Sequence, residues 1–342
     1  MRRYWLGLAA VSALSACGGG NPFVTTTDDG TGTGTTNNSR EGLPPGTNNP
    51  SANAAIFRSE PTEADGGARG DGFATAITYD SATDTFSVDN LGFDGDNGYS
   101  RGTAVSDLGP FAVYEADATF PDIVDGEPIT QFRHRAIYGV STSGNTQFAI
   151  VRTGDYIDYG FGGFIYQRNN GVNLPTTGQA QYTGSMAGLR DFDAAGGLEY
   201  TTADVRIAID FDDFNDTTGT RGDAVNGTID NRRIFDLNGN DITTDVVNRI
   251  NAENTLTLTD VPDLTFNVGP GVMDDNGEII GTLNSYYTDG NGDTQTYESG
   301  NYYAVVSGDD AEEIAGIVVI TNGIDPAGDT VRETGGFIVY NN

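Results

Sequence analysis

Alternating hydrophobic and polar positions dominate the second half of the chain. Val205, Ile207 and Ile209 are separated by charged or small residues, and residues 225–229 repeat the pattern. A period of two is typical of half-buried antiparallel strands. Counted from Gln179 onward, these runs predict about eight strands. Eight antiparallel strands can close into a barrel whose interior is filled by side chains.

Other segments of this half fit the same barrel. Ile279–Tyr287 and Tyr302–Val306 read as two strands joined by the polar turn Thr288–Asp293. Ile314–Ile320 is apolar on both faces, which indicates a central strand. Thr244–Glu253 is the one predicted helix, an excursion between strands with Thr244 as its cap.

The first half also predicts short strands, rich in aromatic residues and glycine. They are Phe73–Tyr79, Phe86–Val88, Phe111–Phe120 (closed by Pro121), Gln131–Ser141 and Gln147–Arg152. The last two read as a hairpin around Ser143-Gly144-Asn145. The expected fold class is therefore all-β, with a β-rich handle-like subdomain at 56–171 and a barrel domain at 172–342.

The N-terminus carries the features of an export signal. Arg2 and Arg3 precede a short apolar run, which ends in Leu14-Ser15-Ala16-Cys17. The run has the length of a secretory signal and is too short to span a bilayer. The last four residues resemble the lipobox of bacterial lipoproteins, which implies a signal peptide at 1–16 and lipid attachment to Cys17. A plain secretory signal that contains a cysteine is the alternative.

Residues 17–55 are predicted to be a disordered tether. Threonine, glycine, asparagine and proline fill the segment, with almost nothing to bury. A flexible coil of this length would let the folded part stand away from the membrane.

The charge of the chain limits the kinds of partner that it is expected to bind. The formal net charge is −32, and all 17 basic residues are arginine. Such a chain repels phosphate backbones and anionic lipid, so nucleic acid is not expected as a partner, and membrane contact is expected through the lipid anchor alone. A solvated acidic surface is the plainest explanation, and cation binding or a basic partner are the alternatives.

Four segments of the second half resemble one known family. Leu174–Gly184 looks like the opening barrel strand of the transferrin-binding protein B family. Ala311–Gly316 and Gly335–Phe337 look like its closing hairpin, and Val225–Ile229 matches a short strand between them. The resemblance implies a lipoprotein anchored in the outer membrane and exposed at the cell surface.

The resemblance also implies a function without enzymatic activity. Such a protein would bind a protein ligand, or haem or another iron carrier, and pass it to an outer-membrane transporter. The segments that carry the resemblance are strand and turn positions, so they transfer no binding residue. The alternative is a structural or adhesive envelope protein with calcium-binding acidic turns.

Tyrosines are the candidate ligand contacts. Tyr286, Tyr287, Tyr302 and Tyr303 flank the turn at 288–293. Adjacent strand residues face opposite ways, so one tyrosine of each pair is expected to point outward. An exposed tyrosine offers a large contact area, whereas barrel packing and cross-strand aromatic pairing explain the same residues without a ligand.

Acidic turns are the candidate metal sites. Asp289, Asn291 and Asp293 place oxygen atoms at alternate positions, as calcium loops do, and turns at Asp94 and Asp236 are similar. Asp, Asn and Gly also build tight turns unaided. Calcium is therefore a possible cofactor and not a required one.

The single histidine gives little support to catalysis. His134 lies between Arg133 and Arg135 on a predicted strand, and two neighbouring cations would disfavour its protonation. A structural histidine is the plain reading, and an axial haem ligand is the alternative. No phosphate-binding or dinucleotide motif is present, so the chain is expected not to be an enzyme.

Overall fold

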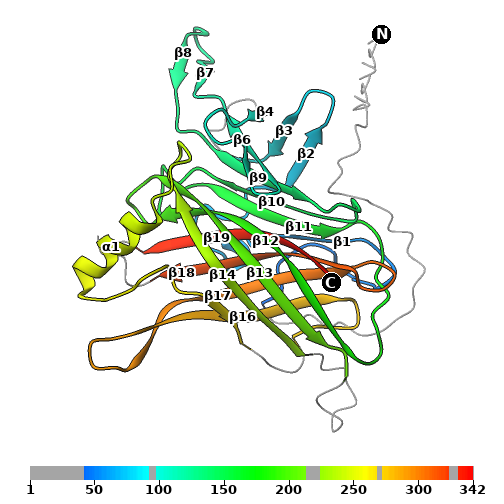
Figure 1. Ribbon diagram of the computed structural model, residues 1–342. Helices are drawn as coiled ribbons and strands as arrows, with labels where there is room; N and C mark the ends of the chain where they lie inside the picture. The colour runs from blue at the N-terminus through cyan, green and yellow to red at the C-terminus, as the bar shows by residue number, and fades with distance from the viewer. Residues whose placement is uncertain (1–41, 92–97, 213–223, 268–271, 323–329, 342) are drawn as a thin grey trace, which may run out of the picture.

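Two β-sheets built from consecutive halves of the chain form the molecule (Figure 1). The structure is a computed structural model that describes residues 42–91, 98–212, 224–267, 272–322 and 330–341. The predicted signal peptide, Cys17 and most of the predicted tether lie outside these residues. No helix in the described part of the chain has the length and apolar character needed to cross a bilayer.

The second half forms a closed barrel of eight antiparallel strands, as the alternation predicts. The strands are β12 (Gln179–Phe192), β13 (Leu198–Asp210), β14 (Ala224–Phe235), β15 (Leu264–Phe266), β16 (Glu278–Thr288), β17 (Thr294–Ser307), β18 (Glu313–Asn322) and β19 (Val331–Asn341). The last strand pairs with the first from Tyr182↔Asn341 to Phe192↔Val331, which closes the cylinder.

The barrel interior is built from the apolar members of the alternating runs. Val205, Ile207 and Ile209 point into one buried cluster with Phe266 and Tyr302. Because alternate residues of a strand face opposite ways, the intervening positions of β13 lie on the outer wall. The pattern that predicted the strand also identifies its buried face.

One wall of the barrel is short and is completed by a helix. β15 has three residues, against 12 in β14 and 11 in β16. Helix α1 (Thr243–Asn254) lies between β14 and β15 in sequence and packs Val246, Val247 and Ile250 with Ile234. The helix begins at Thr243, so the prediction of Thr244 as its cap is wrong: the N-cap position is Ile242. The Asp241 carboxylate accepts the N–H of Thr243 instead (3.0 Å).

The first half forms a nine-stranded antiparallel sheet, here called the handle sheet. Its strands lie in the order β1-β11-β10-β9-β6-β4-β3-β2, with β5 also paired to β6. The strands are β1 (Ile56–Ser59), β2 (Ala76–Asp80), β3 (Thr85–Asp89), β4 (Gly98–Arg101), β5 (Asp107–Leu108), β6 (Phe111–Ala116), β9 (Arg135–Val140), β10 (Thr146–Arg152) and β11 (Gly162–Arg168), and a 3₁₀ turn spans Glu63–Asp65. The predicted hairpin around Gly144 is the β9–β10 hairpin.

A separate two-stranded hairpin projects from the handle sheet (Figure 1). The sequence predicts one strand over Phe111–Phe120, and this prediction is wrong. β6 ends at Ala116, and β7 (Thr119–Pro121) pairs with β8 (Pro128–Thr130) outside the sheet. Strand propensity is high throughout the run, but pairing depends on neighbours, and beyond Ala116 the handle sheet offers none.

Strands of the handle sheet pack against the outer barrel wall, and this contact is here called the seam. β9, β10 and β11 meet β17, β18 and β19 there. Phe148 and Phe164 of the handle share one apolar cluster with Val305, Ile317 and Ile338 of the barrel. The two sheets therefore share a core and form one folded unit.

A barrel glycine sets how closely the two sheets approach. A Cβ added at Gly336 would lie 2.1 Å from the ring carbon Cε2 of Phe148. The absence of a side chain at this position on β19 lets the Phe148 ring lie directly on the barrel backbone. Interiors are packed densely enough that such a contact fixes the separation of the layers.

Ion pairs are buried in the same seam. The Arg152 guanidinium is fully buried and donates to both carboxylate oxygens of Glu60. Arg332 of the barrel pairs with Asp71 of the handle at 2.6 Å, and Arg58 of the handle pairs with Glu278 of the barrel at 2.7 Å. Buried charges need such partners, because desolvation of an isolated charge is costly.

Part of the predicted tether belongs to the folded unit. Residues 42–55 run along β1 and the seam, and Gly46 pairs with Arg58 as a β-bridge. The Arg168 guanidinium donates to the carbonyls of Ser51 and Ala54 and also to the barrel carbonyl of Val306. Residues 42–55 therefore pack with the folded unit.

Candidate functional site

The projecting hairpin, here called the arm (residues 117–132), is locally rigid. The N–H of Asp122 donates to the carbonyl of Glu127 (2.8 Å), and that of Gly126 to the carbonyl of Asp122 (2.8 Å). Gly126 has φ +76°, a conformation that favours glycine. The carboxylate of Asp122 also accepts the N–H of Val124 at 2.7 Å. These bonds hold the tip in one conformation.

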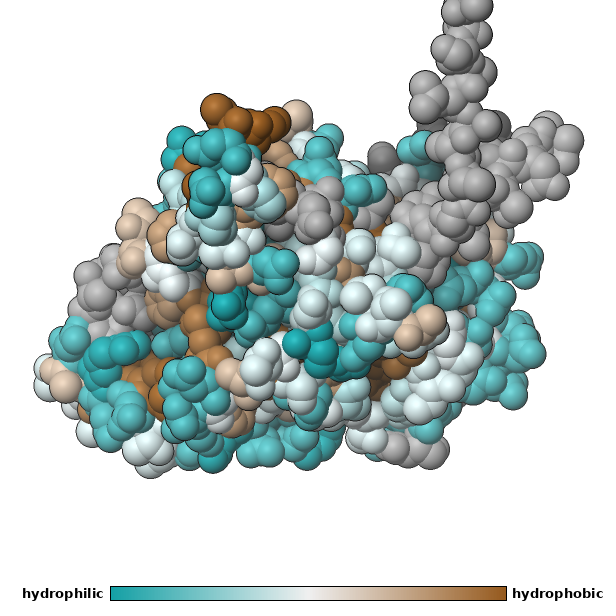
Figure 2. All heavy atoms as spheres, turned by 90° about the horizontal axis from the view of Figure 1, so that it is seen from above, coloured by the Kyte–Doolittle hydropathy of each residue, from teal (hydrophilic) through white to brown (hydrophobic). Residues whose placement is uncertain are grey.

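That tip presents large apolar side chains to solvent. Ile123 is 97% exposed and Val124 is 88% exposed. Ile129 and Phe132 add two further exposed apolar side chains along the arm. From above, an apolar patch projects beyond the hydrophilic surface around it (Figure 2). Because exposed apolar residues on a rigid projection lose little entropy on binding, the arm is suited to insertion into a partner.

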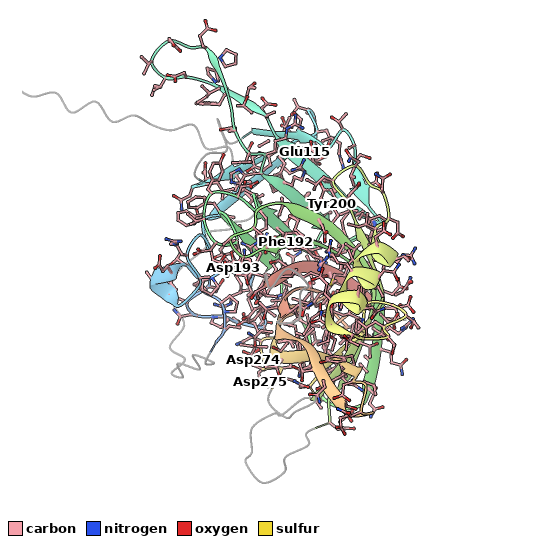
Figure 3. All side chains as sticks on the ribbon, turned by 90° about the vertical axis from the view of Figure 1, so that its left-hand side faces the viewer. Glu115, Phe192, Asp193, Tyr200, Asp274 and Asp275 are labelled. Atoms are coloured by element: carbon pink, nitrogen blue, oxygen red, sulfur yellow. The ribbon has the colours of Figure 1, made fainter. Side chains whose placement is uncertain are left out.

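Aromatic rings support the foot of the arm. The Phe132 and Tyr156 rings meet edge to face, with centroids 5.0 Å apart, and the Tyr156 hydroxyl accepts the N–H of Phe132 at 3.0 Å. Phe161 continues the row beneath Tyr156 and contacts Phe73 edge to face. The row supports the arm at the point where it leaves the sheet. The arm itself projects from the rest of the molecule in Figure 3.

The arm carries negative charge and no positive charge. Asp117, Asp122, Asp125 and Glu127 lie on it, and its sequence contains no arginine. In the part of the chain that the structure describes, no ion pair involves these four carboxylates. An apolar tip between unpaired carboxylates is complementary to an apolar pocket with a basic rim, and it disfavours an anionic lipid surface.

His134 lies at the foot of the arm and is fully buried. Burial lowers the pKa of this imidazole to about 4, since desolvation disfavours the charged form. The neighbouring cations are neutralised by Glu115, which pairs with Arg133 at 3.1 Å and with Arg135 at 3.4 Å. The sequence therefore predicted the direction of the pKa shift, but the cause is burial and not the flanking arginines.

The structure separates the two tyrosine pairs that the sequence placed around one turn. Tyr286 and Tyr287 lie beside the β16–β17 turn, and Tyr286 is 46% exposed. Tyr302 and Tyr303 lie much farther along β17, opposite Gly281 and Ile280.

Each tyrosine of the second pair is covered. Tyr302 points into the barrel and stacks on Phe266, with centroids 4.1 Å apart. Tyr303 points outward, to the wall that the handle covers. The rings of Tyr303 and Phe164 are stacked there, with centroids 6.2 Å apart. Among the four, Tyr286 is the one with a large exposed surface. Ligand binding by these tyrosines stays a prediction.

The acidic turn at Asp289 uses its carboxylate to hold the backbone. One Asp289 oxygen accepts the N–H groups of Asn291 and Asp293, both at 2.9 Å. The other accepts the side-chain amide of Gln295. Hydrogen bonds from these backbone N–H groups lower the pKa of Asp289.

The same turn chemistry recurs twice. Asp236 accepts the N–H groups of Asn238 and Asn240, and Asp274 accepts those of Asn276 and Glu278. In each turn the glycine between the two donors has a positive φ. The turn at Asp94 lies outside the described residues.

These bonds explain the acidic turns as backbone caps. Within the described ranges no group of three or more His, Cys, Asp or Glu residues is placed to hold a metal ion. Calcium binding by Asp289, Asn291 and Asp293 stays a prediction.

Sequence reasoning missed the arm, although a signal for it was present. Asp125-Gly126 is a dipeptide typical of tight turns, and Pro121 and Pro128 lie on either side of it. These two prolines are paired across the hairpin. Proline has no backbone N–H to donate to a further strand, so these two positions are typical of a hairpin with no strand paired to its outer edges.

Comparison with known proteins finds similarity among solved structures. No family model matches the chain, and no curated protein matches it. A double mutant of Transferrin Binding Protein B from Haemophilus parasuis Hp5 is 10% identical, with a TM-score of 0.36 over 78% of this chain and 42% of that one. A single mutant from the same source is 12% identical, with a TM-score of 0.33 over 68% of this chain and 44% of that one. The chain thus spans less than half the length of these two proteins.

A crystal structure described as a surface lipoprotein is also similar. It is 12% identical, with a TM-score of 0.29 over 60% of this chain and 80% of that one. The chain is therefore similar, at low identity, to solved structures of transferrin-binding protein B and of a surface lipoprotein.

Proposed function

We propose that this protein is an outer-membrane lipoprotein that captures a protein ligand at the cell surface through the arm, without catalysing a reaction. The observation that carries the proposal is the exposure of Ile123 and Val124 at a tip whose backbone is fixed by its own hydrogen bonds. A solvated monomer gains nothing from that arrangement, whereas a partner would bury both side chains.

The proposal also includes the lipid anchor and the placement of the folded unit outside the membrane. Lipid attached to Cys17 would hold the chain at the outer membrane, and the N-terminal segment would let the folded unit extend from it. The ligand passes from this protein to a membrane transporter. A haem-type ligand is the alternative to a protein, and the absorbance of captured material distinguishes the two.

The side chains of the arm indicate the chemistry of the ligand surface that would bind them. Ile123 and Val124 require an apolar pocket, and the carboxylates of Asp122, Asp125 and Glu127 favour a basic rim around it. Full burial of each aliphatic side chain contributes about 1.5–3 kcal/mol. Their loss is expected to weaken binding at least tenfold, since about 1.4 kcal/mol corresponds to a factor of ten.

Affinity capture with matched variants tests the proposal. The purified protein is immobilised as wild type, as the double variant Ile123→Ser/Val124→Ser, and as Val140→Ser, which removes an exposed valine from strand β9 of the handle sheet. We expect wild type and Val140→Ser to retain the same protein from growth medium or envelope extract, and the double variant to lose it. Equal retention by all three variants would exclude the arm.

Surface display is tested on cells. Protease added to intact cells is expected to remove the folded unit, whereas protease-resistant protein that becomes sensitive after the outer membrane is opened would contradict the proposal. The cellular result tests orientation and the capture result tests the arm, so the two parts fail separately.

A further inference from the structure

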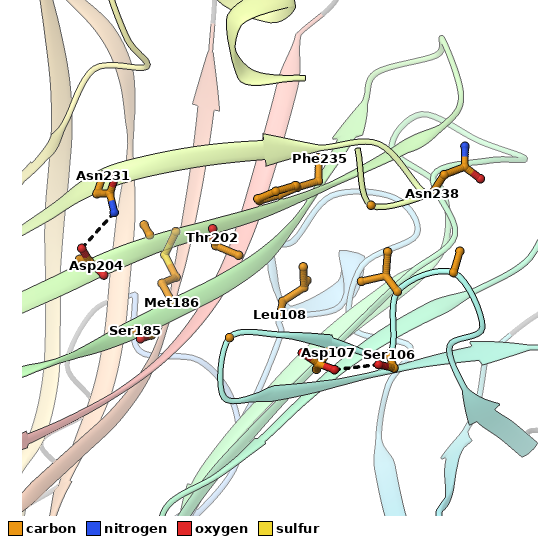
Figure 4. A pocket seen from close by; sticks show the side chains of 15 residues that line it. Ser106, Asp107, Leu108, Ser185, Met186, Thr202, Asp204, Asn231, Phe235 and Asn238 are labelled. Carbon is orange, nitrogen blue, oxygen red and sulfur yellow. Dashed lines mark hydrogen bonds between the residues drawn. The ribbon is translucent and has the colours of Figure 1, made fainter. Parts of the chain in front are cut away.

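A pocket lies where the handle meets the barrel wall. Its volume is about 570 Å³, within the range of small-molecule sites. The loop 104–109 of the handle forms one side, and β12, β13 and β14 form the other (Figure 4). The arm contributes no residue to its lining, so the pocket is a separate feature.

The inner surface of this pocket is apolar. Val105 and Leu108 of the handle loop are largely buried side chains that line it. Met186 of β12 also borders the pocket, but its side chain packs in the barrel interior. Phe235, at the end of β14, adds a half-buried aromatic ring. Such a surface favours a ligand with an apolar face.

Polar groups surround this surface, and none of them is positively charged. Carboxylates come from Asp107 and Asp204, and amides from Asn231 and Asn238. Three hydroxyls complete the polar lining, from Ser106, Ser185 and Thr202. The structure describes every one of these lining residues, and no arginine is among them, so the pocket repels anionic ligands.

Irregular backbone places two of the polar groups. The register of β13 and β14 shifts between Thr202 and Asp204, which is a β-bulge. Asn231, opposite the bulge, has φ +51°, and its amide donates to Asp204 at 3.2 Å. Bulges re-aim side chains, and positive φ outside glycine is strained, so both features are frequent at functional sites.

From this lining we propose that the pocket binds a neutral sugar ring. A sugar presents an apolar face, which fits the surface at Leu108 and Phe235. It also presents hydroxyls that both donate and accept hydrogen bonds. Carboxylates such as Asp204 accept from those hydroxyls, whereas an amide such as Asn231 accepts and donates. An organic cation has donors alone and could not accept from the second N–H of the Asn231 amide, whose first N–H donates to Asp204.

The test uses the whole protein and a defined set of probes. An array of neutral, acidic and amine-bearing glycans is probed first, and calorimetric titration then gives the affinity for the best neutral glycan. We expect neutral glycans to bind and acidic ones not to bind. Binding limited to amine-bearing probes, or no binding to any glycan, would overturn the proposal.

Variants place the binding in the pocket. Asn231→Gly keeps a residue that tolerates positive φ and removes the amide, so the strand pairing is retained. Asp204→Ala removes the carboxylate. Each is expected to weaken glycan binding at least tenfold, whereas Asn226→Gly, at an exposed position of the same strand, leaves it unchanged. Equal affinity in all three variants would place the glycan elsewhere and overturn the proposal.

Discussion

The seam and the arm invert the usual placement of polar and apolar side chains in opposite ways. The seam buries charges, with Arg152 fully enclosed between Glu60 and neighbouring carboxylates. The arm exposes Ile123 and Val124 to solvent. In the seam every charge has a partner inside the molecule, so the inversion fixes one sheet on the other. On the arm Ile123 and Val124 are almost fully exposed among the described residues, so the inversion favours a partner outside the chain.

The comparison also explains the acidic surface. Arginines such as Arg58, Arg152 and Arg332 are used inside the seam. With no lysine in the chain, the surface has few cations left to balance its carboxylates. The net charge of −32 itself follows from 49 acidic residues against 17 arginines.

Removal of one seam charge is expected to have the largest effect. Arg152→Met leaves Glu60 buried without its partner, and breaking a buried pair in this way costs about 3–5 kcal/mol. Arg69→Met removes an equally well-aligned but exposed pair with Asp158 and is expected to change little. Denaturant unfolding measures both, and the double variant Ile123→Ser/Val124→Ser should match wild type. Equal stability of Arg152→Met and wild type would show that the seam pair does not fix the sheets.

Acid is expected to weaken the fold through His134 at the foot of the arm. Its pKa is about 4 in the folded state and about 6.5 in the unfolded chain. The unfolded state therefore binds the proton first, and the stability present above pH 6.5 falls as the pH drops towards 4. The loss is about 3 kcal/mol, at 1.36 kcal/mol for each pKa unit.

A variant isolates this effect from the titration of carboxylates. His134→Phe keeps a ring in the buried site and removes the titrating group. The difference in unfolding free energy between pH 7 and pH 4.5 is expected to be smaller in the variant than in wild type. The same pH dependence in both proteins would assign the acid sensitivity to groups other than His134.

Close packing in the seam predicts an intermediate effect. Gly336→Ala forces a methyl group into the Phe148 ring, and such overpacking typically costs about 1–3 kcal/mol. Gly290→Ala, where an added Cβ meets no atom within 4 Å, is the matched control. Thermal unfolding compares the two, and equal melting temperatures would mean that the layers separate easily.

The acidic turn at Asp289 predicts the smallest effect. Asp289→Ala removes the acceptor of two backbone N–H groups, so a small fall in Tm is expected with or without calcium. If calcium raises the Tm of wild type and not of the variant, the turn binds the ion. Carboxylates of the arm, such as Asp125, would then also need testing as cation ligands.

The sequence predicted the barrel because strands outside the seam, such as β13, have one buried face. Val205, Ile207 and Ile209 mark the inside by their spacing alone. The resemblance to transferrin-binding protein B rests on strand and turn positions of the same half, and it implied the eight-stranded barrel that the structure contains.

The seam and the arm were harder to predict for a physical reason. Arg152 and Glu60 read as surface residues in sequence, and their burial depends on pairing between segments far apart along the chain. In the arm, Phe120 looks like the end of a buried strand, although its partner is Ile129 of a free hairpin. In both places tertiary contacts override what local pattern indicates.

Arg168 has a mechanical consequence for a tethered protein. Its guanidinium donates to carbonyls of Ser51 and Ala54 near the N-terminus and to those of Asn276 and Val306 in the barrel. Tension applied from the N-terminal end would first load the hydrogen bonds of Pro45 and Thr47 to β1, and it would then reach this clamp and divide between both sheets. The path bypasses the projecting hairpin, so drag on a captured partner and pull from the anchor would load different hydrogen bonds.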